Sequence, residues 1–500
     1  MKIKRGVVLG DGARAITVEK ISSDNLYLRL NDKGQLRILP LVIIRDITSA
    51  LKAGKIELKD IERKYRTQNN LPNLFDELGL DYDKYLLGFD TTIKKICEFE
   101  LSQSEQVHVN NFLQLPKPFI LLAGISGTGK TRYVREQASA HNADGRNYCI
   151  VPVRPDWHEP SDLLGYVSRI SDKVKAEYVT TKVLIFIIDA WRAVAPGASA
   201  EGMGELDFNV PPYWLCLDEM NLAPVEQYFA DYLSVLESRK FEGGEYYCEP
   251  LLDASILKTK DTHMQSDLGL IHDDDLWQYF LKHGIALPPN LIVAGTVNMD
   301  ETTHGFSRKV IDRALTLDFG EFFPNDYDRF FGGQDKNRLF TYSLLTQTTR
   351  EDLDGSIDPD GSKTIGFLKA VNHILKQTPF ELAYRALNEL LLHVASFAPQ
   401  DDRYLQAIWD DFLMTKILPR IDGDEDKLRV IMDGESKNLL DEVSGLLEVQ
   451  LASIWNSTRP DLFRETVNSE VIDTIPCRSK NKLEWMKARL ESNTFTSFWP

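Results

Sequence analysis

The sequence predicts an α/β protein whose core is a parallel five-stranded sheet, followed by a helical second half. Between residues 116 and 325, five short apolar runs alternate with longer stretches of helical periodicity. Apolar runs of strand length that are separated by helices are typical of parallel sheets covered on both faces. A glycine-rich loop directly follows the first run, and from about residue 340 onward the pattern is helical.

The elements follow one another in a regular order along the chain. The expected strands are 119–123, 148–153, 214–218, 291–296 and 314–319, with an insertion at about 240–290. The expected helices of the second half are 365–377, 383–397, 403–417 and 437–455. This order predicts a core over 116–325, a helical lid over 326–430 and a helical C-terminal region over 431–500.

The N-terminal part differs from the rest in charge. Residues 1–66 carry a net charge of +7, whereas the whole chain carries −17, so the remainder carries −24. Short β-rich stretches at 15–18, 26–30 and 36–38 precede a helical pattern at 47–65, which predicts a small mixed α/β domain over 1–70. A helical linker, with a helix at 91–101, is expected over 71–115. The basic charge favours an acidic partner such as DNA, and a solvated basic face is the alternative.

Composition excludes several classes of protein. The five cysteines are scattered and contain no CxxC pair, so neither a disulfide framework nor a zinc site is predicted. No run of 18 uncharged apolar residues occurs, and Asp11, Arg14 and Glu19 interrupt any continuous apolar region after the basic first residues. We therefore expect a cytoplasmic protein without a membrane span or a signal peptide.

The glycine-rich loop carries the most specific chemical signal. It reads Gly124-Ile125-Ser126-Gly127-Thr128-Gly129-Lys130-Thr131 and fits the pattern GxxxxGK[ST]. Such a loop wraps its backbone N–H groups around phosphates, and the helix that follows adds its positive N-terminal end. Lys130 is predicted to reach the β and γ phosphates, and Thr131 to offer its hydroxyl to Mg²⁺. A glycine-rich turn without a ligand is the structural alternative.

Two carboxylates end the third expected strand. Asp218 and Glu219 follow the apolar run from Trp214, about ninety residues after the loop. Ligands of open α/β sheets bind at the carboxyl ends of the strands, so both carboxylates should face the same crevice as the loop. Asp218 is predicted to hold Mg²⁺, and Glu219 to orient and activate the attacking water.

Three further residues are candidates for the same reaction. Asn298 follows the fourth strand and can position water against the γ-phosphate, although an Asx turn would also explain it. Arg308 and Arg313 precede the fifth strand, where an arginine can reach the nucleotide of a neighbouring subunit. A surface ion pair with Asp312 is the alternative for either arginine.

These motifs together resemble the McrB family of AAA+ NTPases over about residues 116–425. The matching stretches are Leu217-Asp218-Glu219-Met220-Asn221-Leu222-Ala223-Pro224, Gly295-Thr296-Val297-Asn298-Met299-Asp300-Glu301-Thr302-Thr303, Tyr384-Arg385 through Asn388-Glu389, and Lys416-Ile417-Leu418-Pro419-Arg420. The resemblance implies an AAA+ fold and a hexameric motor. It also implies that Arg385 acts as a lid arginine on the phosphates.

The resemblance further implies a role in restriction of foreign DNA. Motors of this family bind DNA through an N-terminal domain and drive a separate McrC-like endonuclease, and this chain shows no nuclease motif of its own. The best-known members hydrolyse GTP and carry Asp-Arg-Ser three residues after the asparagine. Here Glu301-Thr302-Thr303 stands at that place, so GTP and ATP both remain candidate substrates.

Two other functions fit part of the pattern. A MoxR-like AAA+ ATPase that remodels a protein partner would share the loop, the acidic pair and the oligomer. A nucleotide-gated binding module without catalysis would be expected to lack at least one of Lys130, Thr131, Asp218 and Glu219, all of which are present. Stimulation of turnover by DNA would separate the restriction motor from the remodelling ATPase.

Overall fold

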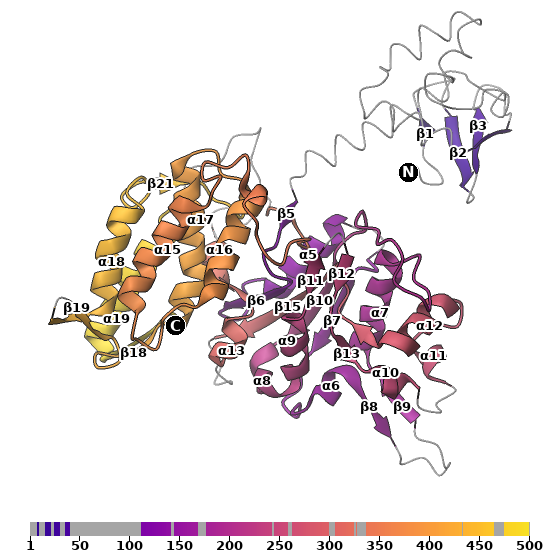
Figure 1. Cartoon of the computed structure of the whole chain (residues 1–500), viewed down its shortest axis with the longest axis horizontal. Helices are drawn as coiled ribbons and strands as arrows, with labels where there is room; N and C mark the ends of the chain where they lie inside the picture. The colour runs from indigo at the N-terminus through magenta and orange to yellow at the C-terminus, as the bar shows by residue number, and fades with distance from the viewer. Residues whose placement is uncertain are drawn as a thin grey trace, which may run out of the picture. The chain divides into compact units, whose positions relative to one another are not determined.

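A computed structural model describes most of the chain (Figure 1). It describes residues 112–499 except for the following short segments: 142–144, 169–176, 243–244, 259–262, 300–305, 325–326, 328–336, 433 and 465–474. Before residue 112 it describes the backbone of four strands. The contacts divide the chain into two units, residues 1–111 and residues 112–500.

The first unit contains a four-stranded antiparallel sheet. Its strands are β1 (Val8–Leu9), β2 (Ile16–Ile21), β3 (Asn25–Leu30) and β4 (Leu36–Pro40), in the order β1-β2-β3-β4. The last three confirm the expected β-rich stretches, and β1 was not predicted. The helices expected at 47–65 and 91–101 lie outside the described residues.

The second unit is a mixed α/β body built on the predicted five-stranded sheet. Its strands are β6 (Phe119–Gly124), β7 (Tyr148–Pro152), β10 (Tyr213–Asp218), β15 (Leu291–Asn298) and β16 (Leu315–Asp318). They pair in parallel in the order β16-β6-β15-β10-β7. All five expected strands are therefore confirmed, and β6 and β15 are buried along their whole length.

Helices cover both faces of this sheet. Side chains of a strand alternate between faces, so Ile120 and Leu122 of β6 pack in one apolar cluster and Leu121 in another. The first cluster includes residues of α5 (Lys130–His141). The second includes α7 (Lys182–Val194), α8 (Val225–Tyr228), α9 (Ala230–Leu236) and α12 (Asp274–His283). Helix α5, which begins at the end of the glycine-rich loop, therefore packs against one face of the sheet.

Two sets of short elements are added to this core. A hairpin of β8 (Gly165–Ser168) and β9 (Glu177–Thr180) follows α6 (Pro160–Leu164). The expected insertion contains β11 (Lys240–Glu242), β12 (Glu245–Tyr247), β13 (Pro250–Leu252), α10 (Ala254–Leu257), α11 (Met264–Asp267), α12 and β14 (Ile285–Ala286). Both sets lie outside the five-stranded sheet.

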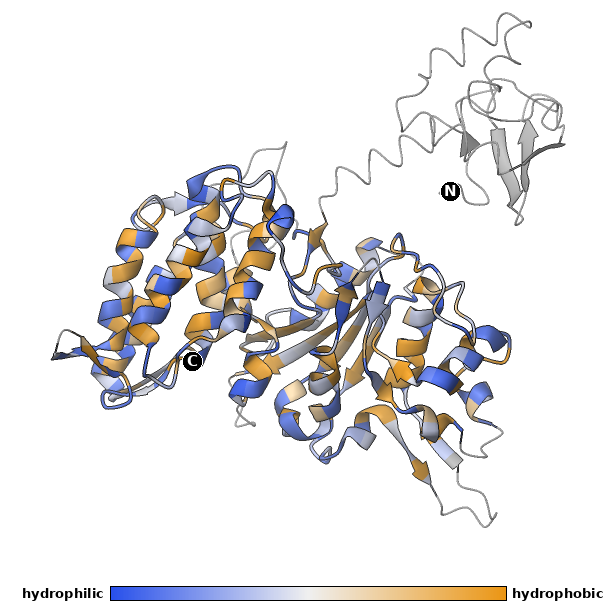
Figure 2. Ribbon diagram, in the orientation of Figure 1, coloured by the Kyte–Doolittle hydropathy of each residue, from blue (hydrophilic) through white to orange (hydrophobic). Residues whose placement is uncertain are grey.

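The second half is helical, as predicted. Its helices are α15 (Ser362–Leu375), α16 (Tyr384–Phe397), α17 (Asp402–Phe412), α18 (Leu439–Gln450) and α19 (Arg478–Asn493). Apolar and polar residues alternate along them (Figure 2), and their buried residues share one apolar cluster. The predicted lid and the predicted C-terminal region therefore form one body. That body also contains short strands that were not expected: β18 (Asp422–Asp424), β19 (Arg429–Met432), β20 (Glu435–Asn438) and β23 (Phe495–Ser497).

Buried ion pairs fix this helical body internally and to the sheet. Arg459 is fully buried and pairs with Asp410 at 2.6 Å and with Asp411. Lys482 of α19 pairs with Asp318, the last residue of β16, at 2.8 Å. Because leaving one buried partner unpaired costs several kcal/mol, these pairs specify how the helices meet the sheet. Among the described helices, none is both long and apolar enough to cross a membrane.

Candidate functional site at the carboxyl end of the sheet

The glycine-rich loop joins the end of β6 to the start of α5. Gly127 and Gly129 have φ angles of 79° and 93°, a region that glycine enters without steric cost. The side chain of Lys130 is buried, and its Nζ donates hydrogen bonds to the carbonyl oxygens of Gly124 (3.0 Å) and Ile125 (2.7 Å). The loop is thus closed around its own lysine.

Thr131 and Asp218 meet directly. The Thr131 hydroxyl donates a hydrogen bond of 2.7 Å to Oδ1 of Asp218, across 87 positions of sequence. Both groups offer hard oxygen atoms, which are the ligands that Mg²⁺ prefers. Among the described residues, no cluster of three or more acidic, histidine or cysteine side chains forms a metal site. Mg²⁺ is commonly held by one or two carboxylates together with substrate phosphates and water, so this pair fits such an ion.

A buried threonine that the sequence analysis did not single out orders the acidic pair. The Thr296 hydroxyl donates to Oδ1 of Asp218 at 2.7 Å and accepts from the backbone N–H of Glu219 at 2.9 Å. It lies on β15, directly beside β10, and is 2% exposed. The available signal was a polar residue within an apolar strand, two positions before Asn298.

Glu219 leaves the strand through an uncommon backbone conformation. Its φ and ψ are 53° and 50°, a left-handed geometry that costs a residue with a Cβ about 1–2 kcal/mol. The hydrogen bond from its N–H to Thr296 helps to offset that cost. Such strained residues concentrate at functional sites, where the surrounding structure holds them. Here the turn exposes the Glu219 side chain at the tip of β10.

Asn298 lies at the next strand tip and contacts the same glutamate. Its Nδ2 is 3.4 Å from Oε1 of Glu219, and its carbonyl accepts from Nδ2 of Asn221 at 3.0 Å. In the sheet register Asn298 is beside Gly124, the first residue of the loop. The loop, Asp218, Glu219 and Asn298 therefore gather at one edge, as expected for parallel strands.

Arg313 and Arg385 lie at the other end of the sheet. Both pair with Glu237: Nε and Nη2 of Arg313 donate to its two oxygens at 2.7 and 3.1 Å, and Nη2 of Arg385 lies 2.5 Å from Oε1. The hydrogen bond from Arg313 lowers the pKa of Glu237, and Glu237 raises that of Arg313. All three line a cavity of about 250 Å³ that also includes Lys117 and Pro118, just before β6.

This position does not match the expectation for Arg385 within one chain. The six residues of β6 separate the cavity from the loop, which at about 3.3 Å per residue is roughly 20 Å. Arg385 therefore does not fold back onto the loop of its own chain. The reason is local, because α16 begins beside the C-terminal end of α9 and Glu237 holds both arginines there.

Arg308 takes a third position. It begins α13 (Arg308–Ile311), its Nη1 donates to the carbonyl of Pro379 at 2.5 Å, and its guanidinium lies 5.2 Å from the ring of Phe380. Its Nη2 is 3.9 Å from Asp422. Arg308 thus faces the helical body, whereas Arg313 faces the cavity at the amino end of the sheet.

A buried charge cluster connects the segment of these arginines to the helical body. Lys117 and Lys416 both donate to the carbonyl of Asp312, at 2.7 and 2.5 Å, and both pair with Glu389, at 2.6 and 2.8 Å. Burial lowers the pKa of Lys117 well below its usual value. For Glu389, burial acts to raise the pKa, but the attraction of the two lysines outweighs it and the pKa is lowered. The lysines and the glutamate therefore keep Arg313 in place beside the lid.

Comparison with known proteins adds one finding. A family model described as a domain of unknown function (DUF8727) matches residues 346–495, which is most of the helical body. No match was found among curated proteins. The family match covers neither the glycine-rich loop nor the acidic pair, so their interpretation rests on the geometry of the site.

Proposed function

We propose that this chain is a P-loop NTPase of the AAA+ type that hydrolyses GTP or ATP with Mg²⁺. The observation that carries the proposal is the hydrogen-bonded set Thr131–Asp218–Thr296–Glu219–Asn298 beside the Gly124–Thr131 loop. Three separate segments of the chain bring these groups to one edge of the sheet. An ordinary glycine-rich turn would not need this arrangement.

The residues of the loop would bind and orient the triphosphate. The N-terminal end of α5 and the loop N–H groups favour phosphate oxygens. Lys130 would exchange its bonds to the Gly124 and Ile125 carbonyls for bonds to the β and γ phosphates. Thr131 and Asp218 would hold Mg²⁺, which neutralises charge that develops on the phosphates.

Glu219 and Asn298 would act on the attacking water. Glu219 is the general base in this proposal, since its side chain is exposed to water at the strand tip. Asn298, through its amide 3.4 Å from that carboxylate, would fix the direction in which Glu219 points. Thr296 holds the backbone of Glu219 and the carboxylate of Asp218 together and so positions both.

The arginines support a ring in which neighbouring subunits complete each site. Arg313 and Arg385 are exposed in part at the end of the sheet remote from the loop, where they cannot serve the nucleotide of their own chain. We assign the role of arginine finger to Arg313 before Arg308, because Arg308 is engaged by the helical body. The oligomer proposed is a hexamer, as the resemblance implies.

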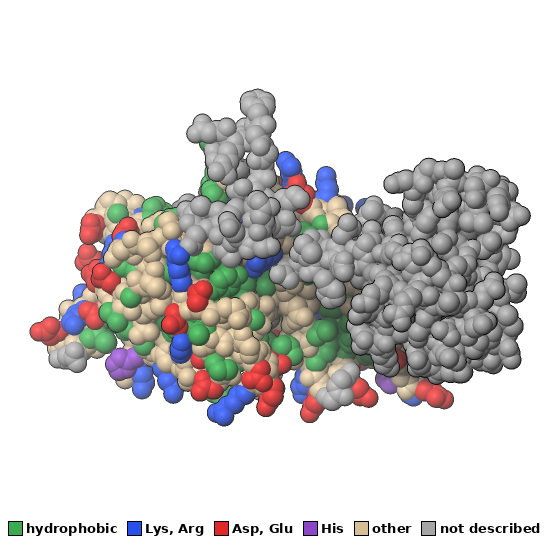
Figure 3. All heavy atoms as spheres, turned by 90° about the horizontal axis from the view of Figure 1, so that it is seen from above, with side chains coloured by type: hydrophobic (Ala, Val, Ile, Leu, Met, Phe, Trp, Pro, Cys, Tyr) green, Lys and Arg blue, Asp and Glu red, His purple; other side chains and the backbone are tan. Residues whose placement is uncertain are grey.

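The biological role proposed is a motor in restriction of foreign DNA that drives a McrC-like endonuclease in the cytoplasm. The basic charge of residues 1–66 supports DNA binding by the N-terminal domain. In contrast, acidic and basic side chains are interspersed on the described face shown in Figure 3. The alternative is a MoxR-like ATPase that remodels a protein partner.

The test is release of phosphate by the full chain with GTP and with ATP, each with and without duplex DNA. Lys130→Ala serves as the control for contaminating NTPases, because it removes the lysine that contacts the phosphates. DNA-stimulated turnover that Lys130→Ala abolishes would support the restriction motor. Turnover indifferent to DNA would favour the remodelling ATPase, and turnover equal in Lys130→Ala would refute the site.

A further inference from the structure

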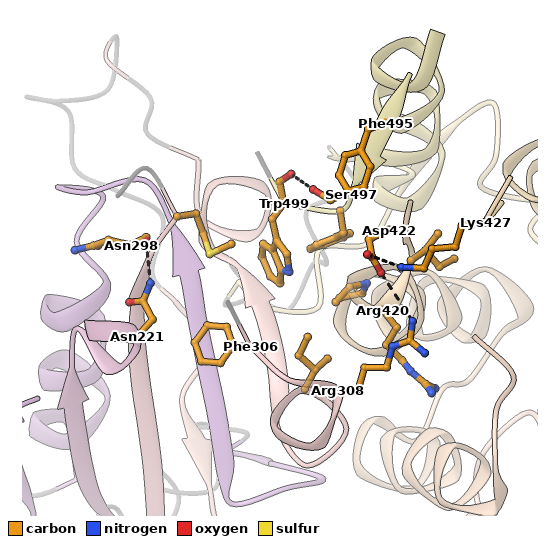
Figure 4. Close-up of a pocket in the computed structure, with 15 residues that line it drawn as sticks. Asn221, Asn298, Phe306, Arg308, Arg420, Asp422, Lys427, Phe495, Ser497 and Trp499 are labelled. Carbon is orange, nitrogen blue, oxygen red and sulfur yellow. Dashed lines mark hydrogen bonds and ion pairs between the residues drawn. The ribbon is translucent and has the colours of Figure 1, made fainter. Parts of the chain in front are cut away.

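A second cavity lies beside the site, where the core meets the helical body. It has a volume of about 510 Å³ and is lined by residues at the tip of β15, in α13, in the turn around β18 and at the C-terminal end of the chain (Figure 4). None of the residues from Gly124 to Thr131 lines it. Its size falls within the range of pockets that bind small molecules.

The charged groups of this cavity are mostly cationic. Arg308, Arg420 and Lys427 line it together with one carboxylate, Asp422. Lys427 donates to Asp422 at 2.7 Å, and Nη2 of Arg308 is 3.9 Å from the same side chain. Two guanidinium groups and an ammonium offer thirteen N–H donors in all. The contacts found among the described residues use a minority of these donors, so the cavity suits an anion with several acceptor oxygens.

Aromatic rings form another part of its wall. Phe306, Phe495, Phe498 and Trp499 all line the cavity. Backbone pairing fixes the position of this wall, because β23 pairs with β18 and Ser497 lies opposite Asp422. The carbonyl oxygen of Trp499 also accepts a hydrogen bond of 2.6 Å from Arg489. Phe495 is 47% exposed, which leaves much of its ring open to a ligand.

We propose that this cavity binds a mononucleotide, with its phosphate on the cationic side and its base against the aromatic side. Arg420 also pairs with Asp312 at 3.2 Å. A phosphomonoester supplies acceptors for the N–H groups of these three cations that their contacts within the chain leave over. A planar base supplies the face that stacks on phenylalanine or tryptophan. Asn221 and Asn298 lie at the edge of the cavity, where Nδ2 of Asn221 donates to the backbone carbonyl of Asn298 (Figure 4).

The position of the cavity gives the bound mononucleotide a consequence for turnover, a step that rests on the proposed function. Asn298 lines the cavity and also contacts Glu219. Most of the other lining residues come from the body that carries α19, whose Lys482 pairs with Asp318 at the tip of β16. A mononucleotide bound here would lie beside the strand tip that carries Asn298, and would act on turnover as an effector.

The binding test uses the full-length Lys130→Ala variant, so that the loop does not contribute. Calorimetric titration with AMP, GMP and inorganic phosphate should show one site for at least one mononucleotide, with phosphate binding about tenfold or more weakly because it lacks a base. Absence of binding by both mononucleotides would overturn the proposal. Equal affinity for inorganic phosphate would overturn the role of the aromatic wall and with it the ligand class.

Matched substitutions then locate the site. Lys427→Glu in the same background should weaken binding about tenfold or more, because it places a second carboxylate beside Asp422 where the phosphate would lie. Lys369→Glu makes the same charge change at an exposed position of α15 outside the cavity and should leave affinity unchanged. Phe495→Ala should weaken binding of the mononucleotide more than it weakens binding of inorganic phosphate. Binding unaffected by both cavity variants would contradict the assignment, whether or not the chain hydrolyses nucleotides.

Discussion

The two ends of the parallel sheet hold different kinds of polar site. At the carboxyl end, short side chains from α5, β10 and β15 share directed hydrogen bonds, and the Glu219 side chain is exposed. At the amino end, long cationic side chains surround Glu237 and pair with it. In the proposed function, the first arrangement would take a metal ion and water. The second has charge in excess of what its own chain neutralises.

Under the proposed function, the two ends would take different parts in one reaction. Hydrogen bonds of fixed geometry are needed where a phosphate and a water must be aligned, since small misplacements are costly there. A guanidinium that enters another subunit's site needs reach, and the side chains of Arg313 and Arg385 are 22% and 48% exposed beside Glu237. We therefore read the carboxyl end as the site of the chain itself and the amino end as its contribution to a neighbour.

The largest expected effect comes from removing the Arg313 side chain at the amino end of the sheet. Arg313→Ala should lower turnover by about 10³-fold or more, the range found for arginine fingers, while nucleotide affinity changes little. The measurement is steady-state phosphate release together with binding of a non-hydrolysable nucleotide. Arg308→Ala, which removes an arginine held by the helical body, is the matched control and should have a smaller effect on turnover.

A mixing experiment tests whether Arg313 acts in a neighbour. Subunits with Arg313→Ala keep Glu219, and subunits with Glu219→Gln keep Arg313. Mixed oligomers should therefore recover activity that neither variant shows alone. If the mixtures remain as inactive as the separate variants, Arg313 does not act between subunits.

The next largest effect comes from replacing Glu219 at the carboxyl end of the sheet. Glu219→Gln should lower turnover by about 10²- to 10⁴-fold, the range of a lost general base, and should preserve nucleotide binding. The amide retains the size of the side chain and can still contact Asn298, so stability should be unaffected. Single-turnover hydrolysis separates the chemical step from product release. A variant that retains normal single-turnover rates would show that another group activates water.

A smaller effect is expected for Thr296, whose hydroxyl links Asp218 to the backbone of Glu219. Thr296→Val removes the hydroxyl between Asp218 and the Glu219 N–H, and Mg²⁺ affinity or turnover should fall about 10- to 100-fold, as for other groups that orient metal ligands. Thr316→Val is the matched control on β16. Thr316 is 1% exposed and its hydroxyl has no partner among the described residues, so its loss should cost neither stability nor activity. An equal loss of activity in both variants would point to a packing effect in the sheet.

The sequence was sufficient for the parts of the molecule that depend on local pattern. Five apolar runs predicted the five parallel strands, because strands buried on both faces must be continuously apolar. The spacing within Gly124–Thr131 and the position of Asp218 at a strand end predicted which residues gather at one edge. These inferences need only strand direction and side-chain alternation.

Other parts depend on tertiary contacts that one sequence does not reveal. The position of Arg385 follows from the packing of α16 beside α9, and Glu237 was not a candidate because it lies at the end of an ordinary helix. Thr296 was hidden within an apolar strand. Across the predicted boundary at residue 430, the buried residues of α15, α17, α18 and α19 share one cluster, although a polar stretch separates α17 from α18 in sequence.

The smallest expected effect is a fall in the free energy of unfolding when the pH is lowered. His393 is buried and His141 is partly buried, and burial lowers the pKa of each from 6.5 to about 4. His141 contacts the carbonyl of Phe340, and His393 contacts that of Glu389 in the lysine–glutamate cluster near the amino end. A depressed histidine pKa means that the unfolded chain binds more protons below pH 6.5. The free energy of unfolding should therefore fall as pH drops from 6.5 toward 4, by about 1.4 kcal/mol per histidine at pH 5.5.

This loss can be measured by chemical unfolding of the chain at pH 7.5 and 5.5, with the two histidines replaced by glutamine. The His141→Gln, His393→Gln double variant should be less stable at pH 7.5 but should lose about 3 kcal/mol less than the parent chain on acidification. His373→Gln, at an exposed position of α15, is the control and should keep the full loss. A double variant that loses as much stability as the parent would place the acid sensitivity elsewhere. The amino end would then differ from the carboxyl end in its ion pairs alone, without a contribution from buried histidines.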